Sequence, residues 1–349
     1  MEMVFSFYGS NVLNYEQKIK NEKRITVVFF FIFFLILAFR SVDIGIDLNN
    51  YEYYFESIKM TSWSDLSNLE VELLYVVLNK IVSSIGGDFQ FFLAVVALIC
   101  VFPFAYFYYK ESENAMLTIA IFVNVSIFTM FFSGLRQAIS FSVGIIAFYC
   151  VRNKKIFKFL FWVLIAYLFH KSAVVLIALY PIYHIRITKK SFQFIVPIMG
   201  VLFIFRRQIF DLLLIIFNDF YDREYELADT GAYSILILFV LFTVYSFIEM
   251  DDEFVDKDTM GLRNILVVAT CIQMFASVHS LAMRMNYYFI PFIPVIISKI
   301  STRGNKEDKF IVKIINIVLI AFFLLYFFYE AKNGRDTLRI FPYETFWSR

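Results

Sequence analysis

The chain has 349 residues, of which 60% are hydrophobic, and its formal net charge is only +2 at pH 7. This apolar content, with 46 phenylalanines and 22 tyrosines, exceeds what the core of a water-soluble domain requires and predicts an all-α polytopic membrane protein. The small net charge does not indicate a nucleic-acid partner. The three cysteines lie in apolar runs and indicate neither a disulfide framework nor a metal site.

Residues 1–24 are polar and lack an apolar stretch followed by a small-residue cleavage site, so we expect a retained cytoplasmic segment. Residues 25–329 alternate apolar runs with polar loops, which predicts one membrane domain of about 11 transmembrane helices. Helices are favoured over barrel strands because the runs are continuously apolar. The candidate spans are residues 25–39, 89–109, 115–133, 137–151, 156–169, 172–185, 191–205, 233–249, 262–283, 286–300 and 310–329.

The basic residues of the loops orient these spans with the N-terminus inside. The cytoplasmic loops then hold 14 lysines and 5 arginines, whereas the outside holds 4 lysines and 9 arginines. The extracytoplasmic parts are the loops at about 40–88 and 206–232 and the tail 330–349. Because arginine binds phosphate or carboxylate bidentately and lysine does not, the outer face is predicted to bind anions. The alternative is a general preference of arginine for the membrane interface.

Polar residues gather at the outer ends of four apolar runs. A charge drawn to the centre of a membrane helix costs on the order of 2.5–3.5 kcal/mol, so such residues usually face a polar cavity. The polar residues at the four run ends are Arg40, Asp43 and Asp47 after the first span, Arg136 and Gln137 in "FFSGLRQAIS", His170, Lys171 and Ser172 in "FHKSAVV", and Arg284, Tyr287 and Tyr288 in "AMRMNYYF".

Each of these residues also has a simpler interpretation. Arg136 is either an anion ligand or an interfacial arginine, and His170 is either a base or phosphate partner or a hydrogen-bonded interfacial histidine. Asp47 and Glu72 are either a general base or helix caps paired with arginines. Glu72 lies in "EVELLYVVLNKIVSSIGG", which has the spacing of an amphipathic interfacial helix. An aromatic interfacial belt or a sugar-binding platform would use Tyr51, Tyr53, Tyr54, Tyr287 and Tyr288.

Several motifs of soluble enzymes are missing from the sequence. It has no P-loop, dinucleotide fingerprint, paired-histidine metal motif or serine nucleophile elbow. The "DKD" at 256–258 is similar to an Asp-x-Asp metal clamp, but its loop is too short to form a nucleotide-binding domain, so we predict a solvated turn. We therefore expect no metal and no cofactor.

Six motifs, taken in order, resemble the EpsG family of bacterial polysaccharide polymerases, which includes many Wzy-type O-antigen and capsule polymerases. The resemblance runs from about residue 25 almost to the end, and "LRQAIS" and "HKSAVV" are its most specific parts. The motifs are "RSVDIGIDLNNYEYY", "EVELLYVVLN", "LRQAIS", "HKSAVV", "RMNYYF" and "PYETF".

This resemblance implies a polymerase in the bacterial cytoplasmic (inner) membrane, with its active site on the extracytoplasmic face and an architecture similar to the GT-C glycosyltransferases. The implied substrates are oligosaccharide repeat units on undecaprenyl pyrophosphate, held within the membrane lipid. The growing glycan would leave its carrier and join the non-reducing end of the next lipid-linked unit. A chain-length regulator and a flippase are the implied protein partners.

Under that reading, fixed arginines stabilise the charge that develops on the diphosphate leaving group. Arg136 and Arg284 are the predicted main ligands, supported by Arg40 and Lys171. Asp47, Glu72 or His170 would take the proton of the acceptor hydroxyl. The remaining predicted substrate contacts are Gln137, Ser172, Tyr51, Tyr287 and Tyr288.

Three other functions fit parts of the same pattern. A lipid-linked oligosaccharide flippase would place charges near the middle of the membrane or show related halves, whereas the candidate residues here gather on one side. A membrane O-acyltransferase would use histidine and arginine with an acyl donor. An O-antigen ligase would share the chemistry but use a different acceptor.

Overall fold

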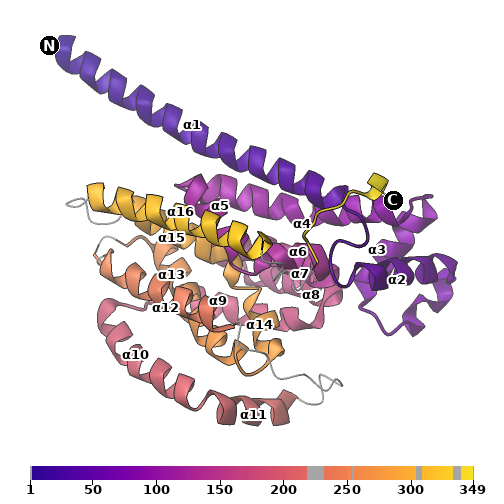
Figure 1. The fold of residues 1–349 in the computed structure, drawn as a ribbon. Coiled ribbons are helices and arrows are strands. Elements are labelled where there is room, and N and C mark those ends of the chain that lie inside the picture. Colours follow the sequence, from indigo (N-terminus) through magenta and orange to yellow (C-terminus); the bar gives the residue numbers. More distant parts are fainter. Residues whose placement is uncertain are drawn as a thin grey trace. The chain divides into compact units, whose positions relative to one another are not determined.

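The computed structural model describes residues 2–217, 232–250, 252–253, 255–303, 309–332 and 339–348. Within these ranges the chain forms α-helices and short 3-10 helices and no β-strand (Figure 1), which confirms the predicted all-α class. The helices divide into two compact units. Unit 1 comprises residues 1–66, 78–135 and 310–349, and unit 2 comprises residues 67–77 and 136–309. The predicted loop 206–232 lies partly outside the described residues, and the predicted domain limits stay a prediction.

Unit 1 is built on the long helix α1, which packs mainly against α4 and α5. Phenylalanine rings fill its core: the Phe33 and Phe131 centroids are 5.3 Å apart, and Phe104 lies 5.1 Å from Phe131 and 5.8 Å from Phe122. Such aromatic pairs add to the stability gained from burial alone. The helices of unit 1 are α1 (Glu2–Ala38), α2 (Leu48–Met60), α4 (Phe89–Glu111), α5 (Ala115–Asn124), α6 (Ile127–Ser133), most of α16 (Lys309–Lys332) and the 3-10 helices η1 (Trp63–Asn68) and η6 (Phe346–Ser348).

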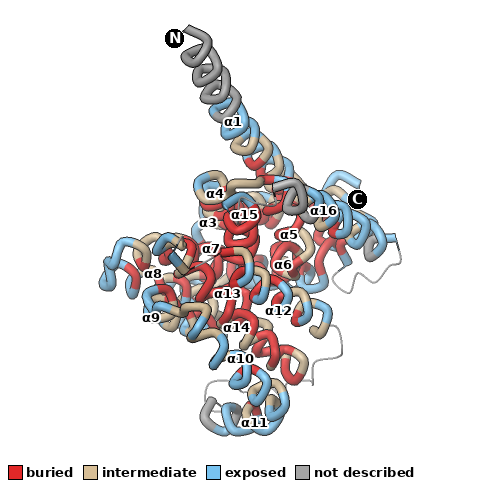
Figure 2. Tube along the Cα trace, turned by 90° about the vertical axis from the view of Figure 1, so that its left-hand side faces the viewer, coloured by how far each residue is buried: buried red, intermediate tan, exposed pale blue. Residues whose placement is uncertain are grey.

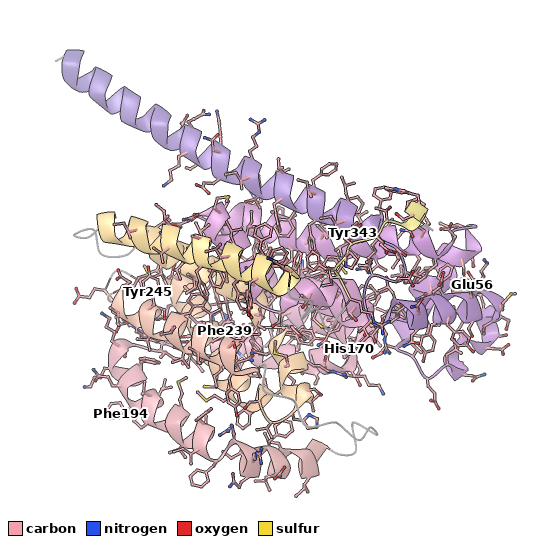
Figure 3. The ribbon with its side chains drawn as sticks, in the orientation of Figure 1. Glu56, His170, Phe194, Phe239, Tyr245 and Tyr343 are labelled. Carbon is pink, nitrogen blue, oxygen red and sulfur yellow. The ribbon has the colours of Figure 1, made fainter. Side chains whose placement is uncertain are left out.

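The described end of the chain is paired with the segment that follows α1. The Ser41 N–H donates to the Glu344 carbonyl at 2.9 Å, and an isolated antiparallel bridge joins Arg40 to Thr345. The Tyr343 hydroxyl, labelled in Figure 3, donates to the Ile36 carbonyl at 2.7 Å. The "PYETF" and "RSVDIG" motifs, some 300 residues apart, are therefore neighbours within unit 1.

Unit 2 is organised around α13, which packs against α9, α10, α12, α14 and α15. Helices α13 and α15 are buried along most of their length (Figure 2). By contrast, α10 exposes apolar side chains such as Phe194, which is 68% exposed, as expected of a lipid-facing helix. The helices of unit 2 are most of α7 (Leu135–Arg152), α8 (Ile156–Phe169), η2 (Lys171–Ala178), α9 (Leu179–His184), α10 (Lys189–Ile204), α11 (Arg206–Phe217), α12 (Ala232–Ile248), α13 (Lys257–Ala276), α14 (Ser280–Asn286), η4 (Ile290–Phe292) and α15 (Ile293–Arg303). The boundaries between the units fall within η1, within α3 (Leu73–Ser84) and at the first residues of α7 and α16.

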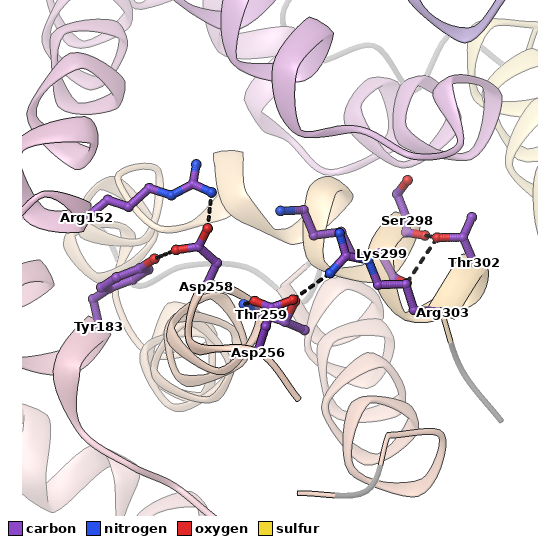
Figure 4. A network of polar contacts seen from close by, with 9 residues as sticks. All are labelled: Arg152, Tyr183, Asp256, Asp258, Thr259, Ser298, Lys299, Thr302 and Arg303. Carbon is purple, nitrogen blue, oxygen red and sulfur yellow. Dashed lines mark hydrogen bonds and ion pairs between the residues drawn. The ribbon is translucent and has the colours of Figure 1, made fainter. Parts of the chain in front are cut away.

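The "DKD" at 256–258, predicted as a solvated turn, instead forms the N-cap and first residues of α13, and its carboxylates bind arginines of the same unit (Figure 4). Asp256 pairs with Arg303 at 2.5 Å, and both side chains are nearly half exposed. Asp258 pairs with Arg152 of α7 and accepts a hydrogen bond from the Tyr183 hydroxyl at 2.6 Å. These carboxylates therefore connect α13 to α7, α9 and α15.

Three described helices are long and apolar enough to cross a membrane, namely α4, α7 and α13. Two bent pairs reach that length together: α5 with α6, at 57°, and α14 with the η4–α15 segment, at 47°. The described helices thus provide three spans by length and composition, or up to five if each bent pair is one span. The predicted total of about 11 stays a prediction, because several of the proposed spans are short helices such as α8 and α12.

The region predicted as two long spans, 262–283 and 286–300, is divided differently. Helix α13 ends at Ala276, and a separate short helix, α14, carries Arg284. The break is stabilised by His279, whose Nδ1 accepts the Leu281 N–H at 3.1 Å and so caps α14. Pro291 then lies in η4, where its missing N–H costs little. A bent segment of 277–292 thus replaces the short connection predicted between residues 283 and 286.

Candidate functional site in unit 2

An ion pair joins Arg136 to Glu72 in unit 2. Arg136 lies in the first turn of α7, and its Nη1 donates to Oε2 of Glu72 at 2.5 Å. Glu72 directly precedes α3, and its carbonyl accepts the Tyr75 and Val76 N–H groups of the first turn. The Glu72 side chain is 11% exposed and that of Arg136 is 27% exposed, so the pair is partly shielded from water. The carboxylate therefore fixes the position of Nη1 of Arg136.

The Glu72 carboxylate is held in its charged form. Burial opposes that charge, but the Arg136 guanidinium, a favourable interaction with His170 and hydrogen bonds leave the pKa of Glu72 below its ordinary value. A carboxylate with a lowered pKa is a poor proton acceptor near neutral pH. Glu72 is thus better suited to orient Arg136 than to deprotonate a sugar hydroxyl.

His170 lies between α8 and η2, where it is labelled in Figure 3. Its Nδ1 is 2.7 Å from Oγ of Ser172 and 3.3 Å from the Ser172 backbone nitrogen. Burial lowers the pKa of His170 to about 4; the Glu72 charge opposes this shift, and the Arg136 and Arg284 charges add to it. The imidazole is therefore neutral at pH 7, and it lies within electrostatic range of Glu72, Arg136 and Arg284.

Arg284 is positioned by the backbone of α14. The Gln137 side-chain amide donates to the Arg284 carbonyl at 2.7 Å, which connects the start of α7 to α14. Two residues later, the amide of Asn286 donates to the Ala269 carbonyl at 3.0 Å and to the Gln273 side-chain oxygen at 2.8 Å. Because Asn286 and Gln273 are fully buried, these bonds fix α14 against α13.

Ser172 and Tyr288, both predicted substrate contacts, have buried hydroxyls. Tyr288 Oη is 3.0 Å from Oγ of Ser172 and 3.0 Å from Oγ of Ser140 in α7. Tyr287 is also buried, and its ring centroid is 6.4 Å from that of Phe141. These side chains are buried within unit 2, and their direct contact with substrate stays a prediction.

The structure assigns the predicted residues to different units. Arg136, Gln137, His170, Glu72, Ser172, Arg284, Tyr287 and Tyr288 belong to unit 2, as does Lys171, which is exposed beside His170. Arg40, Asp47 and Tyr51 belong to unit 1. There Arg40 is buried and donates to the Phe131 carbonyl at 2.9 Å, Asp47 is exposed and accepts the Ser133 hydroxyl at 3.0 Å, and Tyr51 is buried.

Sequence reasoning missed three residues that hold this cluster together: Ser140, Gln273 and Asn286. Ser140 is the last residue of "LRQAIS", and Asn286 lies within "RMNYYF", so each belonged to a quoted motif without a role. Gln273 gave one signal, an amide inside an apolar run. Among the described residues, no group of three histidine, cysteine or acidic side chains could hold a metal ion.

A comparison with protein families matches residues 23–345 to the EpsG family. The chain belongs to the EpsG family. EpsG proteins are a Wzy-type polymerase-like family, and their association with glycosyltransferase-like polymerases, together with the apolar helices, identifies a membrane protein of polysaccharide biosynthesis. No curated protein and no solved structure matches the chain.

Proposed function

We propose that this EpsG protein polymerises polysaccharide by transferring a growing glycan from undecaprenyl diphosphate to the non-reducing end of the next lipid-linked repeat unit. The observation that carries the proposal is the family match over nearly the whole chain, combined with two arginines, a histidine and a carboxylate within electrostatic range in unit 2. The GT-C-like architecture, the inner-membrane location and the extracytoplasmic active site belong to the same proposal.

The arginines neutralise the leaving group. As the glycosidic bond to the carrier breaks, negative charge grows on the diphosphate oxygens, and donors already fixed in place stabilise that charge without reorganisation. Arg136 is fixed through Glu72, and the backbone of Arg284 is fixed through Gln137. Because guanidinium groups bind diphosphate oxygens bidentately, this pair suits such a leaving group better than two lysines would. Lys171 is proposed to assist; the predicted role of Arg40, which is buried in unit 1 and donates to the Phe131 carbonyl, stays a prediction.

The acceptor hydroxyl requires a proton acceptor as it attacks. His170 is neutral at pH 7, and a diphosphate bound to Arg136 and Arg284 would offset the two charges that help to lower its pKa, so that it can take this proton, whereas Glu72 is committed to Arg136. Asp47 is exposed in unit 1, and its predicted role as a base stays a prediction. The energy of the reaction comes from the lipid diphosphate itself, so the proposal needs no nucleotide sugar and no cofactor.

The lipid carriers and the glycans enter this proposal as substrates, while a flippase and a chain-length regulator are its protein partners. The flippase would deliver repeat units to the extracytoplasmic face, and the regulator would set the final glycan length. Exposed apolar side chains on α8 and α10, such as Phe157 at 85% and Phe194 at 68%, are compatible with a lipid-embedded enzyme whose substrates arrive laterally.

Deletion of the gene in its host provides the cellular test. We expect the surface polysaccharide to lose its ladder of chain lengths while a single capped repeat unit persists, because assembly and export of one unit precede polymerisation. Gel analysis of surface glycans, with a plasmid-borne copy as the control, measures this result. Loss of every repeat would instead indicate a flippase or ligase, and an intact ladder without acyl groups would indicate an acyltransferase.

A further inference from the structure

Two adjacent arginines, Arg206 and Arg207, begin α11, directly after the end of α10. Arg206 is partly exposed and Arg207 is exposed. Neither forms an ion pair with a carboxylate in the described part of the chain, whereas Arg136 of the site above is paired with Glu72. Two positive charges of unit 2 therefore lie together without a negative partner among the described residues.

Neutral groups hold Arg206 in one orientation. Its Nη1 donates to the Phe203 carbonyl of α10 at 2.7 Å, and its Nη2 donates to the Tyr233 hydroxyl at the start of α12 at 3.1 Å. The guanidinium carbon lies 4.4 Å from the centroid of the Phe203 ring. Because each terminal nitrogen of a guanidinium carries two N–H groups, both keep a second donor for a ligand. The Tyr233 hydroxyl is also within hydrogen-bonding range of Ser277, which follows α13.

The α11 arginines are connected to Arg284 through α14. Phe210 of α11 packs against Leu281 and Ala282 of α14. The Phe210 ring also stacks on His279, the N-cap of α14, with ring centroids 4.9 Å apart. His279 in turn lies within electrostatic range of Arg284. One short helix of unit 2 therefore connects two separate groups of arginines.

The surface beside the α11 arginines is apolar. Helices α10 and α11 are largely exposed (Figure 2). Phe210 faces α14, whereas Ile204, at the end of α10, is 67% exposed, and Leu212 and Ile215 of α11 are 61% and 76% exposed. In a membrane, an apolar surface next to basic residues suits a lipid with an anionic head group, whose chain covers the apolar side chains.

The proposed reaction requires two such lipids at the same time. The growing glycan and the incoming repeat unit are each attached to a carrier diphosphate. Arg136 and Arg284 are assigned to the diphosphate that leaves, on which negative charge develops. The diphosphate of the acceptor keeps its charge and its bonds throughout, so a site for it contributes binding only. A second basic site, apart from the first, meets this need.

We propose that Arg206 and Arg207, together with the Tyr233 hydroxyl, bind the diphosphate of the acceptor carrier. The isoprenoid chain of that carrier then lies along the exposed apolar side chains of α10 and α11. The fork of Arg206, held by Phe203 and Tyr233, suits the bidentate binding of a diphosphate. These residues hold the acceptor next to α14 and take no part in bond formation. This inference rests on the polymerase function proposed above.

Native mass spectrometry of the full-length protein with added undecaprenyl diphosphate counts the bound carriers without turnover. We expect two molecules on the wild type and one on the Arg206→Ala/Arg207→Ala double variant. The remaining molecule should be lost when Arg136→Ala and Arg284→Ala are added. The matched control is Arg186→Ala, which should keep two, because Arg186 is also exposed but precedes α10, a helix roughly 24 Å long that separates it from the α11 arginines.

The same measurement with phosphatidylglycerol distinguishes the carrier from ordinary anionic lipid. We expect undecaprenyl diphosphate to displace phosphatidylglycerol from the wild type. A wild type that binds only one carrier, or a double variant that still binds two and loses only phosphatidylglycerol, would overturn the inference.

The kinetics of extension provide the second measurement. With a preformed glycan on its carrier held at saturation, the double variant should raise the KM for the labelled repeat unit by about 10-fold or more and leave kcat nearly unchanged. Arg136→Ala should instead lower kcat. A double variant with lower kcat and unchanged KM would also contradict the assignment. Because carrier binding is counted without turnover, its failure is separate from failure of the polymerase proposal, which the glycan ladder tests.

Discussion

Replacing Arg136 with alanine is expected to reduce polymerisation by about 100-fold or more, the usual effect of removing a donor aimed at developing negative charge. The substitution removes the guanidinium and leaves the Glu72 carboxylate, 11% exposed, without its partner at 2.5 Å. Arg136→Lys should recover only a small part of the activity, because an ammonium cannot bind Glu72 and a diphosphate oxygen in the same planar, bidentate manner. The measurement is the rate of glycan extension at equal amounts of membrane-inserted protein.

Arg152→Ala is the matched control for this prediction. Arg152 lies in the last turn of the same helix, its side chain is also 27% exposed, and it also pairs with a carboxylate, that of Asp258. Its pair connects helices at the "DKD" turn and has no role in the proposed reaction, so the ladder should persist. A normal ladder from Arg136→Ala, or equal losses in both variants, would show that Arg136 has no special role in the chemistry.

Gly45→Ala is expected to destabilise the protein by at least about 3 kcal/mol, enough to lower the unfolding midpoint by roughly 5–10 °C. Gly45 has a φ of +107°, which side chains with a β-carbon rarely adopt, and an added Cβ would lie 2.1 Å from the Phe132 carbonyl oxygen. The Gly45 backbone is itself held, because its N–H donates to the Arg339 carbonyl at 3.2 Å and its carbonyl accepts the Leu48 N–H at 3.2 Å. Thermal unfolding of purified protein in detergent measures the loss.

Gly86→Ala separates the cost of the positive φ from the cost of the close contact between an added Cβ and its neighbours. Gly86 also has a positive φ, +84°, but an added Cβ would meet no atom within 4 Å. Its substitution should therefore cost only the backbone strain, about 1–2 kcal/mol. Equal losses in the two variants would mean that the close approach of Gly45 to Phe132 does not contribute to stability.

The helical class followed from the sequence because continuous apolar runs satisfy their backbone hydrogen bonds only as helices in a membrane. Helix bounds were predicted well where one apolar run forms one helix, as in α8, whose bounds Ile156–Phe169 equal those of the predicted run; that α8 crosses the membrane stays a prediction. The break between α13 and α14 was not predicted. The break depends on the hydrogen bond from the Leu281 N–H to the His279 side chain. This side-chain cap competes with the backbone hydrogen bonds of a continued helix, and the apolar sequence does not show which of the two forms.

The candidate site was predictable in its residue types but not in its pairings. Arg136 and Arg284 stood out because charged groups beside short turns in an apolar chain need a polar environment. The bond from Arg136 to Glu72 spans 64 residues, and no local pattern indicates such a contact. The role of Ser140 could not be predicted for a different reason. A serine in an apolar helix carries no local signal, and its importance follows only from its contact with the distant Tyr288 hydroxyl.

Purified protein in proteoliposomes, supplied only with repeat units on undecaprenyl diphosphate, gives the most direct test of the proposed activity. We expect glycans of several repeats, one undecaprenyl diphosphate released for each new linkage, and loss of both in Arg136→Ala and Arg284→Ala. Unchanged single repeats and no released carrier, from protein that restores the ladder in cells, would contradict transfer from the lipid diphosphate by this chain.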